Sequence, residues 1–145
     1  MRRPRGDSGN ALVEFTYLAV LLMVPLVYLL LTVFQVQAAA FGTTEAARQA
    51  GRAYARADTV AQGEARATEA VRLAMADQGI EDSTPPVVDC PDPDPCLTPG
   101  SRVVVTVRYR VRLSLLGGLF SKTTAPAVPV TAVHTQVVDR FQAAR

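Results

Sequence analysis

The chain has 145 residues, a formal net charge of +2 and 49% hydrophobic residues. The hydrophobic residues are concentrated near the N-terminus, so only about a hundred residues remain to build a small core. Length, composition and charge therefore argue against an ordinary soluble globule, a large enzyme with a cleft between two lobes, and a nucleic-acid-binding protein.

A long apolar segment dominates the N-terminal region. Thirty uncharged residues separate Glu14 from Glu45, more than the ~20 that span a bilayer as a helix and the ~7–15 of a secretory signal core. Arg2, Arg3 and Arg5 precede the segment and no comparable cluster directly follows it. The sequence predicts a single-pass transmembrane helix with a cytoplasmic N-terminus and an extracytoplasmic C-terminal domain.

Two residues of this segment are unusual. Pro25 removes a backbone donor near its middle, which predicts a kink or a loosened turn. Glu14 places a carboxylate among apolar neighbours, where it must protonate, reach the interface or find a positive partner. Taken alone, Glu14 is compatible with simple headgroup depth as well as with a functional role.

The residues around Glu14 form a recognisable pattern. A short basic leader ends in Gly9, and the chain continues as Asn10-Ala11-Leu12-Val13-Glu14-Phe15. A leader of this kind, followed by a mature chain whose fifth residue is Glu, resembles the class III signal of type IV pilins and pseudopilins. The form Gly-x-Ala-x-Val-Glu-Phe is similar to the TadE-like proteins, which are minor pilins or pseudopilins of tight-adherence (Flp) pilus systems. The resemblance, closest to actinobacterial members, covers roughly residues 5–57.

The resemblance implies roles for three residues. Gly9 would precede the bond that a membrane aspartyl prepilin peptidase cuts, and Asn10 would be the first mature residue. Glu14 would pair with the freed α-ammonium of Asn10 on a neighbouring subunit, which favours axial register because an unpaired buried charge is strongly unfavourable. The implied partners are the peptidase, other pilins or pseudopilins, the pilus assembly platform and membrane lipid.

Two other interpretations of the N-terminal region stay open. The chain could be an unprocessed single-pass anchor that displays an adhesion or sensing module. Alternatively, ordinary signal peptidase could recognise Ala38-Ala39-Ala40 and release a secreted soluble binding module that begins at Phe41.

An amphipathic helix is predicted beyond the membrane. Small apolar residues recur at spacings of three and four over about residues 43–78, and Gly79 is a natural stop. This helix would form one long stem with the transmembrane helix if Gly42 does not interrupt it. The residues at apolar spacing are Ala46, Ala50, Ala53, Tyr54, Ala57, Val60, Ala61, Ala67, Val71, Ala74 and Met75.

Two uses of this helix face are considered equally. It can pack on the sheet of its own domain, or its part from Ala38 to Ala50 can pack against neighbouring pilin helices. The second use assumes that the membrane-proximal half lies beyond the reach of the C-terminal strands. Arg48, Arg52 and Arg56 follow one side at four-residue spacing, which is typical of a solvated face.

Two cysteines bracket a proline-rich loop. Cys90 and Cys96 are close in sequence and would lie outside the cytoplasm, which favours a local disulfide over a metal site. Asp92 and Asp94 lie between them, but the loop lacks the spacing and the oxygen ligands of a calcium site.

The C-terminal region predicts a β-hairpin over about residues 101–141. A strand is predicted from Ser101 to Ser114, in which the odd-numbered residues from Val103 to Leu113 are apolar or aromatic and are expected to face the helix. A second strand is expected from about Ala127, with a possible bulge, and a short third strand near Val87. The even-numbered positions carry Arg102, Arg108, Arg110 and Arg112, a basic stripe that is either solvated or adhesive.

The predicted fold class is α+β: a long N-terminal transmembrane helix extends into an amphipathic stem that packs on a small antiparallel sheet, as in the lollipop shape of pilins. The predicted divisions are a cytoplasmic leader (1–9), a transmembrane helix (10–41) and an extracytoplasmic domain (42–145). The sequence contains no nucleophile constellation, phosphate loop or metal cluster, and His134 has no obvious sequence partner. We therefore expect a structural protein without catalytic residues, metal, cofactor, small-molecule substrate or nucleic acid.

Overall fold

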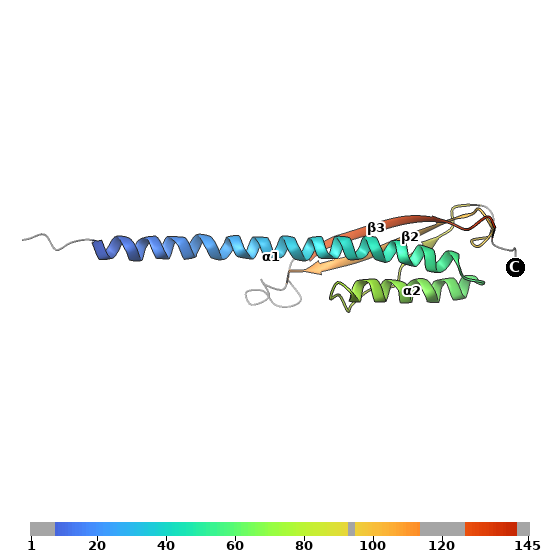
Figure 1. The fold of residues 1–145 in the computed structure, drawn as a ribbon, viewed down its shortest axis with the longest axis horizontal. Helices are drawn as coiled ribbons and strands as arrows, with labels where there is room; N and C mark the ends of the chain where they lie inside the picture. The colour runs from blue at the N-terminus through green and yellow to red at the C-terminus, as the bar shows by residue number, and fades with distance from the viewer. Residues whose placement is uncertain (1–7, 93–94, 114–126, 142–145) are drawn as a thin grey trace, which may run out of the picture. The chain divides into compact units, whose positions relative to one another are not determined.

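The computed structural model describes residues 8–92, 95–113 and 127–141, with side chains from residue 11 onward. Its elements are α1 (Ser8–Ala55), α2 (Val60–Ala76), β1 (Val87–Asp89), β2 (Arg102–Arg112) and β3 (Ala127–Val137) (Figure 1). These elements agree with the predicted α+β class. The chain divides into two compact units, residues 1–34 and 35–145, which are described in turn.

The first unit is helical from Ser8 to Phe34. The helix continues through Pro25 without interruption. Every described side chain from Ala11 to Val27 is exposed, and nearly all of them are apolar. Two threonine hydroxyls in this unit donate hydrogen bonds to backbone carbonyls one turn earlier. Thr16 donates to the Leu12 carbonyl, and Thr32 donates to the Tyr28 carbonyl. These bonds give the two hydroxyl groups a partner on an otherwise apolar helix surface.

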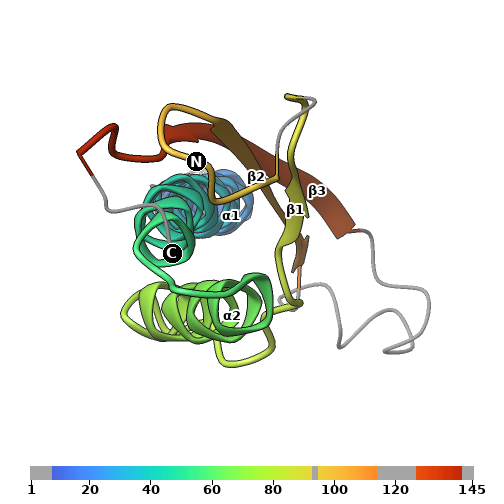
Figure 2. The ribbon, with the colours of Figure 1, turned by 90° about the vertical axis from the view of Figure 1, so that its right-hand side faces the viewer.

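The second unit is built around the remaining part of α1. This part lies between α2 on one side and strands β2 and β3 on the other (Figures 1 and 2). Gly42 does not interrupt α1, so the helix is continuous at the point that the sequence left open. Gly51 allows a close approach to the sheet, since a Cβ atom there would lie 3.2 Å from the Cδ2 atom of His134. His134 thus packs against α1, as expected for a structural residue.

The sheet is antiparallel with the order β1-β2-β3. β2 and β3 pair over eleven consecutive positions, from Arg102 with Val137 to Arg112 with Ala127, so the possible bulge does not occur within this register. The prediction for the odd-numbered residues of β2 is confirmed: Val103, Val105, Val107 and Val111 are buried, whereas the four arginines are exposed. Period-two alternation therefore identified the buried face correctly.

The predicted single helix over residues 43–78 is wrong. α1 ends at Ala55 and α2 begins at Val60, so that α2 runs back along α1 (Figure 1). The cause is a local cap: the Thr59 hydroxyl accepts a hydrogen bond from the backbone N–H of Gln62, and the Gln62 side chain accepts one from the backbone N–H of Asp58. A Thr-x-x-Gln spacing is a helix-start signal, which the continuous apolar spacing masked.

The break changes the phase of the apolar face. Val60 and Ala61, both assigned to that face, are exposed. Gly79 does follow the last helical turn as expected, with φ of 72°, a conformation that favours glycine. The residues of the predicted face that are buried are Ala46, Ala50, Tyr54, Ala57, Ala67, Val71, Ala74 and Met75.

The small-residue face of α1 is used within the domain. Ala46, Ala47 and Ala50 belong to the hydrophobic core together with the valines of β2. Ala39 is 1% exposed and lines the same groove as Tyr109 of β2. The assumption that the membrane-proximal part lies beyond the strands is therefore wrong, because burial by the chain's own elements reaches back to Ala39.

Tyr54 is the largest fully buried side chain of the described residues. Its ring packs directly on Gly63 of α2, where an added Cβ atom would lie 2.9 Å from the Cδ2 atom of Tyr54. Because α2 has no side chain at this position, the aromatic ring of α1 can fill the space between the two helices. This contact holds α2 against α1.

Tyr54 is expected to make the domain sensitive to alkali. Burial raises the pKa of the phenol, and the Glu64 carboxylate raises it further. Because the pKa is higher in the folded state, the stabilisation is fully present below the unfolded value of ~10 and is lost as the pH rises through the folded value. Guanidinium unfolding of the purified chain in detergent, at about pH 8 and about pH 11, should show a smaller alkaline loss for Tyr54→Phe than for wild type. An equal loss in wild type, Tyr54→Phe and the control Tyr109→Phe would contradict this assignment.

Candidate assembly and processing site

The residues of the proposed processing site lie in the first turn of α1. The backbone at Gly9 and Asn10 is helical, whereas residues 1–7 of the leader lie outside the described residues. The first four N–H groups of a helix have no intrahelical partner. Glycine also has the lowest helix propensity of all residues apart from proline. The bond between Gly9 and Asn10 is therefore in the part of α1 that unwinds at the lowest cost.

Glu14 lies one turn further along α1 and is exposed. It forms no hydrogen bond or ion pair with any other described residue. Its neighbours Leu12, Val13 and Phe15 are 72%, 67% and 74% exposed, so they form an apolar surface around the carboxylate. The site thus consists of one acid without a partner among the described residues, on an otherwise apolar helix surface.

The surrounding helix has the properties of a membrane span. α1 is long enough to cross a bilayer, its most apolar stretch has a mean hydropathy of 2.5, and none of that stretch is buried by the described parts of the chain. This agrees with the predicted membrane segment.

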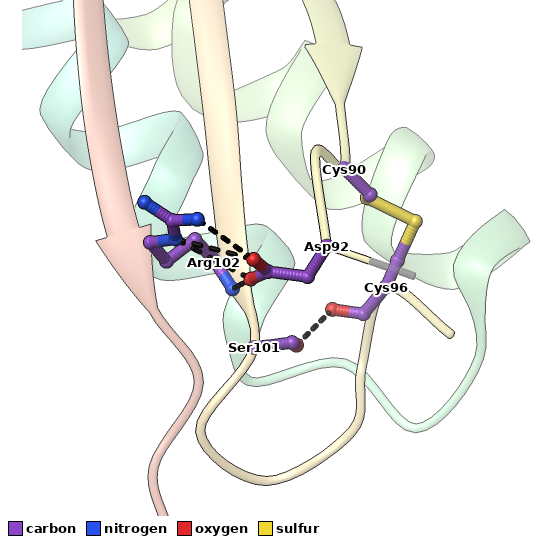
Figure 3. Close-up of a disulfide and its surroundings, with 5 residues drawn as sticks. All are labelled: Cys90, Asp92, Cys96, Ser101 and Arg102. Carbon is purple, nitrogen blue, oxygen red and sulfur yellow. Dashed lines mark hydrogen bonds and ion pairs between the residues drawn. A yellow bond between two sulfur atoms is a disulfide. The ribbon is translucent and has the colours of Figure 1, made fainter. Parts of the chain in front are cut away.

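The disulfide between Cys90 and Cys96 is present, with 5.4 Å between the two Cα atoms (Figure 3). Two further contacts attach the loop to the start of β2. Asp92 accepts hydrogen bonds from the backbone N–H and the guanidinium of Arg102, and the Ser101 hydroxyl donates to the Cys96 carbonyl. The Arg102 contacts lower the pKa of the Asp92 carboxyl. Asp92 thus serves as an internal ion-pair partner, and Asp94 lies outside the described residues.

The ion pair divides the basic stripe. Arg102 is bound to Asp92 at 2.8 Å, whereas Arg108, Arg110 and Arg112 form no ion pair with any residue that the structure describes. The sequence did not reveal this division, because ten positions separate the partners and the loop geometry brings them together. The apolar residues from Leu115 to Phe120, which follow β2 in the sequence, lie outside the described residues.

Removing the disulfide is expected to cost about 2 kcal/mol of unfolding free energy, the loop-closure entropy of so short a ring. The change is Cys90→Ser together with Cys96→Ser, measured by guanidinium unfolding of the domain. Reductant should lower the midpoint of wild type to that of the double variant and leave the variant unchanged. A wild-type midpoint that does not respond to complete reduction would contradict a stabilising role.

No protein-family model, curated protein or solved structure matches this chain. The resemblance to TadE-like proteins therefore depends on the residues of the N-terminal motif and on the physical setting of Glu14.

Proposed function

We propose that the chain is a TadE-like minor pilin or pseudopilin, a structural subunit of a tight-adherence pilus or a related secretion filament. The observation that supports this most strongly is the setting of Glu14, an exposed carboxylate without a partner among the described residues. It lies at the start of a long uncharged stretch of a helix that continues into a folded domain. A helix that serves only as a lipid anchor does not require such a charge. Acidic side chains within a membrane have a high free-energy cost and are usually functional.

Cleavage after Gly9 would complete the assembly site. The new α-ammonium of Asn10 would stand at the N-terminus of α1, where the helix dipole is positive and disfavours a cation. A carboxylate from a neighbouring subunit would offset this repulsion and would itself gain a partner. Glu14 lies four residues from Asn10, or about 6 Å along a helix, so pairing between chains would set a small axial offset.

The proposal also accounts for the two parts of α1. From Ala39 onward one face of α1 is buried by its own domain, whereas the apolar side chains from Ala11 to Val27 are exposed. In the membrane, lipid would cover the first part with the N-terminus cytoplasmic and the domain outside. In a filament, the same surface would be covered by other pilin helices after extraction by the assembly platform.

The test is the N-terminal residue and the intact mass of the chain recovered from its native membrane, with and without the host's prepilin peptidase. A chain that begins at Asn10 only when the peptidase is present would support the proposal. A chain that begins at Met1 or Arg2 in both hosts would indicate an unprocessed anchor, and one that begins at Phe41 would indicate a secreted module. Either of these results would overturn the proposal.

A further inference from the structure

We propose that Arg108, Arg110 and Arg112 form a docking surface for anionic phospholipid headgroups on the extracytoplasmic side of the membrane. This inference uses the single-pass anchoring put forward above, but it does not depend on filament assembly. It assigns a partner to the part of the basic stripe that has none within the described chain.

The first argument is the position of these residues along the chain. Arg108, Arg110 and Arg112 line a groove of about 1060 Å³ together with Gln35 and Ala38 of α1. Gln35 directly follows the 24 residues from Ala11 to Phe34, in which Glu14 is the one charged residue. Twenty helical residues span about 30 Å, the thickness of the hydrocarbon core. Gln35 is therefore placed at headgroup level by chain connectivity, and the end of β2 lies beside it.

The second argument is the unbalanced charge of this end of the sheet. The three arginines are at every second position of β2, so they share one face of the strand. Their cross-strand neighbours on β3 are uncharged: Thr131, Pro129 and Ala127. Of the residues that the structure describes, Asp82 is the one acidic residue that lines the groove with them. Neighbouring guanidinium groups on one strand repel each other, so a bound phosphate between them would lower the free energy.

The other basic groups of the domain do not share this position. Arg102 lies six residues along β2 from Arg108, about 20 Å away, and is paired with Asp92. Arg48 and Arg52 lie thirteen and seventeen residues beyond Gln35 on the same helix, which is about 20–25 Å. That separation exceeds two Debye lengths at physiological salt, so the electrostatic attraction between the lipid headgroups and Arg48 or Arg52 should be screened.

The test uses the full chain in lipid nanodiscs and measures the rate at which phenylglyoxal modifies each arginine, read by peptide mass spectrometry. One set of discs contains phosphatidylcholine alone, and the other contains equal parts of phosphatidylcholine and phosphatidylglycerol. An anionic membrane surface attracts each nearby basic residue by about 1 kcal/mol, which corresponds to about a fivefold change in the ratio of lipid-bound to free side chain. Arg108, Arg110 and Arg112 should therefore react about fivefold more slowly in the anionic discs, and high salt should remove the difference. Arg48 and Arg52 are the internal controls and should react equally in both discs.

Three results would overturn the proposal. Equal rates for Arg108, Arg110 and Arg112 in both kinds of disc would exclude anionic lipid as the partner. Slowing by inorganic phosphate in phosphatidylcholine discs would identify a free anion instead of a headgroup. Equal slowing of Arg48 and Arg52 would show a general effect of the disc charge. A chain that does not enter the discs at all would contradict the membrane anchoring itself, which separates the failure of this inference from the failure of the proposed function.

Discussion

Glu14→Leu is expected to abolish filament assembly while the chain still inserts into the membrane. Loss of the carboxylate would leave the α-ammonium of Asn10 without a partner at the positive end of α1, and breaking a buried ion pair in this way costs about 3–5 kcal/mol. A cost of that size at each subunit contact lowers the association constant more than a hundredfold. Insertion should be unchanged or favoured, because leucine is more apolar than a carboxylate.

The measurement compares surface filaments with membrane-inserted chain in cells that carry the complete assembly system. Glu45→Leu is the matched control. Glu45 is also an exposed glutamate of α1, it accepts a side-chain hydrogen bond from Gln49, and it marks the other end of the uncharged segment. Normal filaments in the control and none in Glu14→Leu would agree with a pilin. Normal filaments in both variants would show that Glu14 is only an acid at headgroup depth and that the chain is a simple anchor.

Tyr54→Ala is expected to remove about 3–5 kcal/mol of the unfolding free energy of the domain, a large part of its total stability. Tyr54 is 1% exposed, and its ring fills the space beside Gly63 that α2 leaves open. Without the ring, a cavity would separate α1 from α2, and the short capped turn between them could not hold the helices together.

The stability change is measured by guanidinium unfolding and by the rate of limited proteolysis in α2. Phe41→Ala is the control, because Phe41 is an aromatic residue of the same helix but is 73% exposed. A variant of an exposed side chain should change stability by no more than about 0.5 kcal/mol. If both variants unfolded at the same denaturant concentration, Tyr54 would not be the contact that joins the helices.

Patterns that depend on neighbouring residues were read correctly from the sequence. The thirty uncharged residues and the alternating valines of β2 each specify an element and its apolar surface, because burial follows directly from the period of that element. The disulfide was predictable for a similar reason, since Cys90 and Cys96 are six positions apart and have no competing cysteine. The candidate site residues Gly9, Asn10 and Glu14 also come from a local pattern, but their roles in processing and assembly stay predictions.

The turn between α1 and α2 was missed although its signal is in the sequence. The small residues before and after Thr59 continue the same spacing, and alanine favours a helix in either phase. The capping hydrogen bonds of Thr59 and Gln62 start a new helix only when α2 also gains a surface to pack on. Tyr54 and the small residues of α1 provide that surface.

The sequence by itself determined the long apolar helix, the position of Glu14 near its start, the disulfide and the buried face of β2, because each depends on residues within one element or one loop. Tertiary structure decided which elements cover the alanines of α1, where α2 turns back, and which arginine of β2 is paired with a described acidic residue. Those outcomes depend on contacts between distant positions, such as Asp92 with Arg102 and Tyr54 with Gly63. A periodic pattern shows that a face is apolar or charged, but only the packed chain selects what that face contacts.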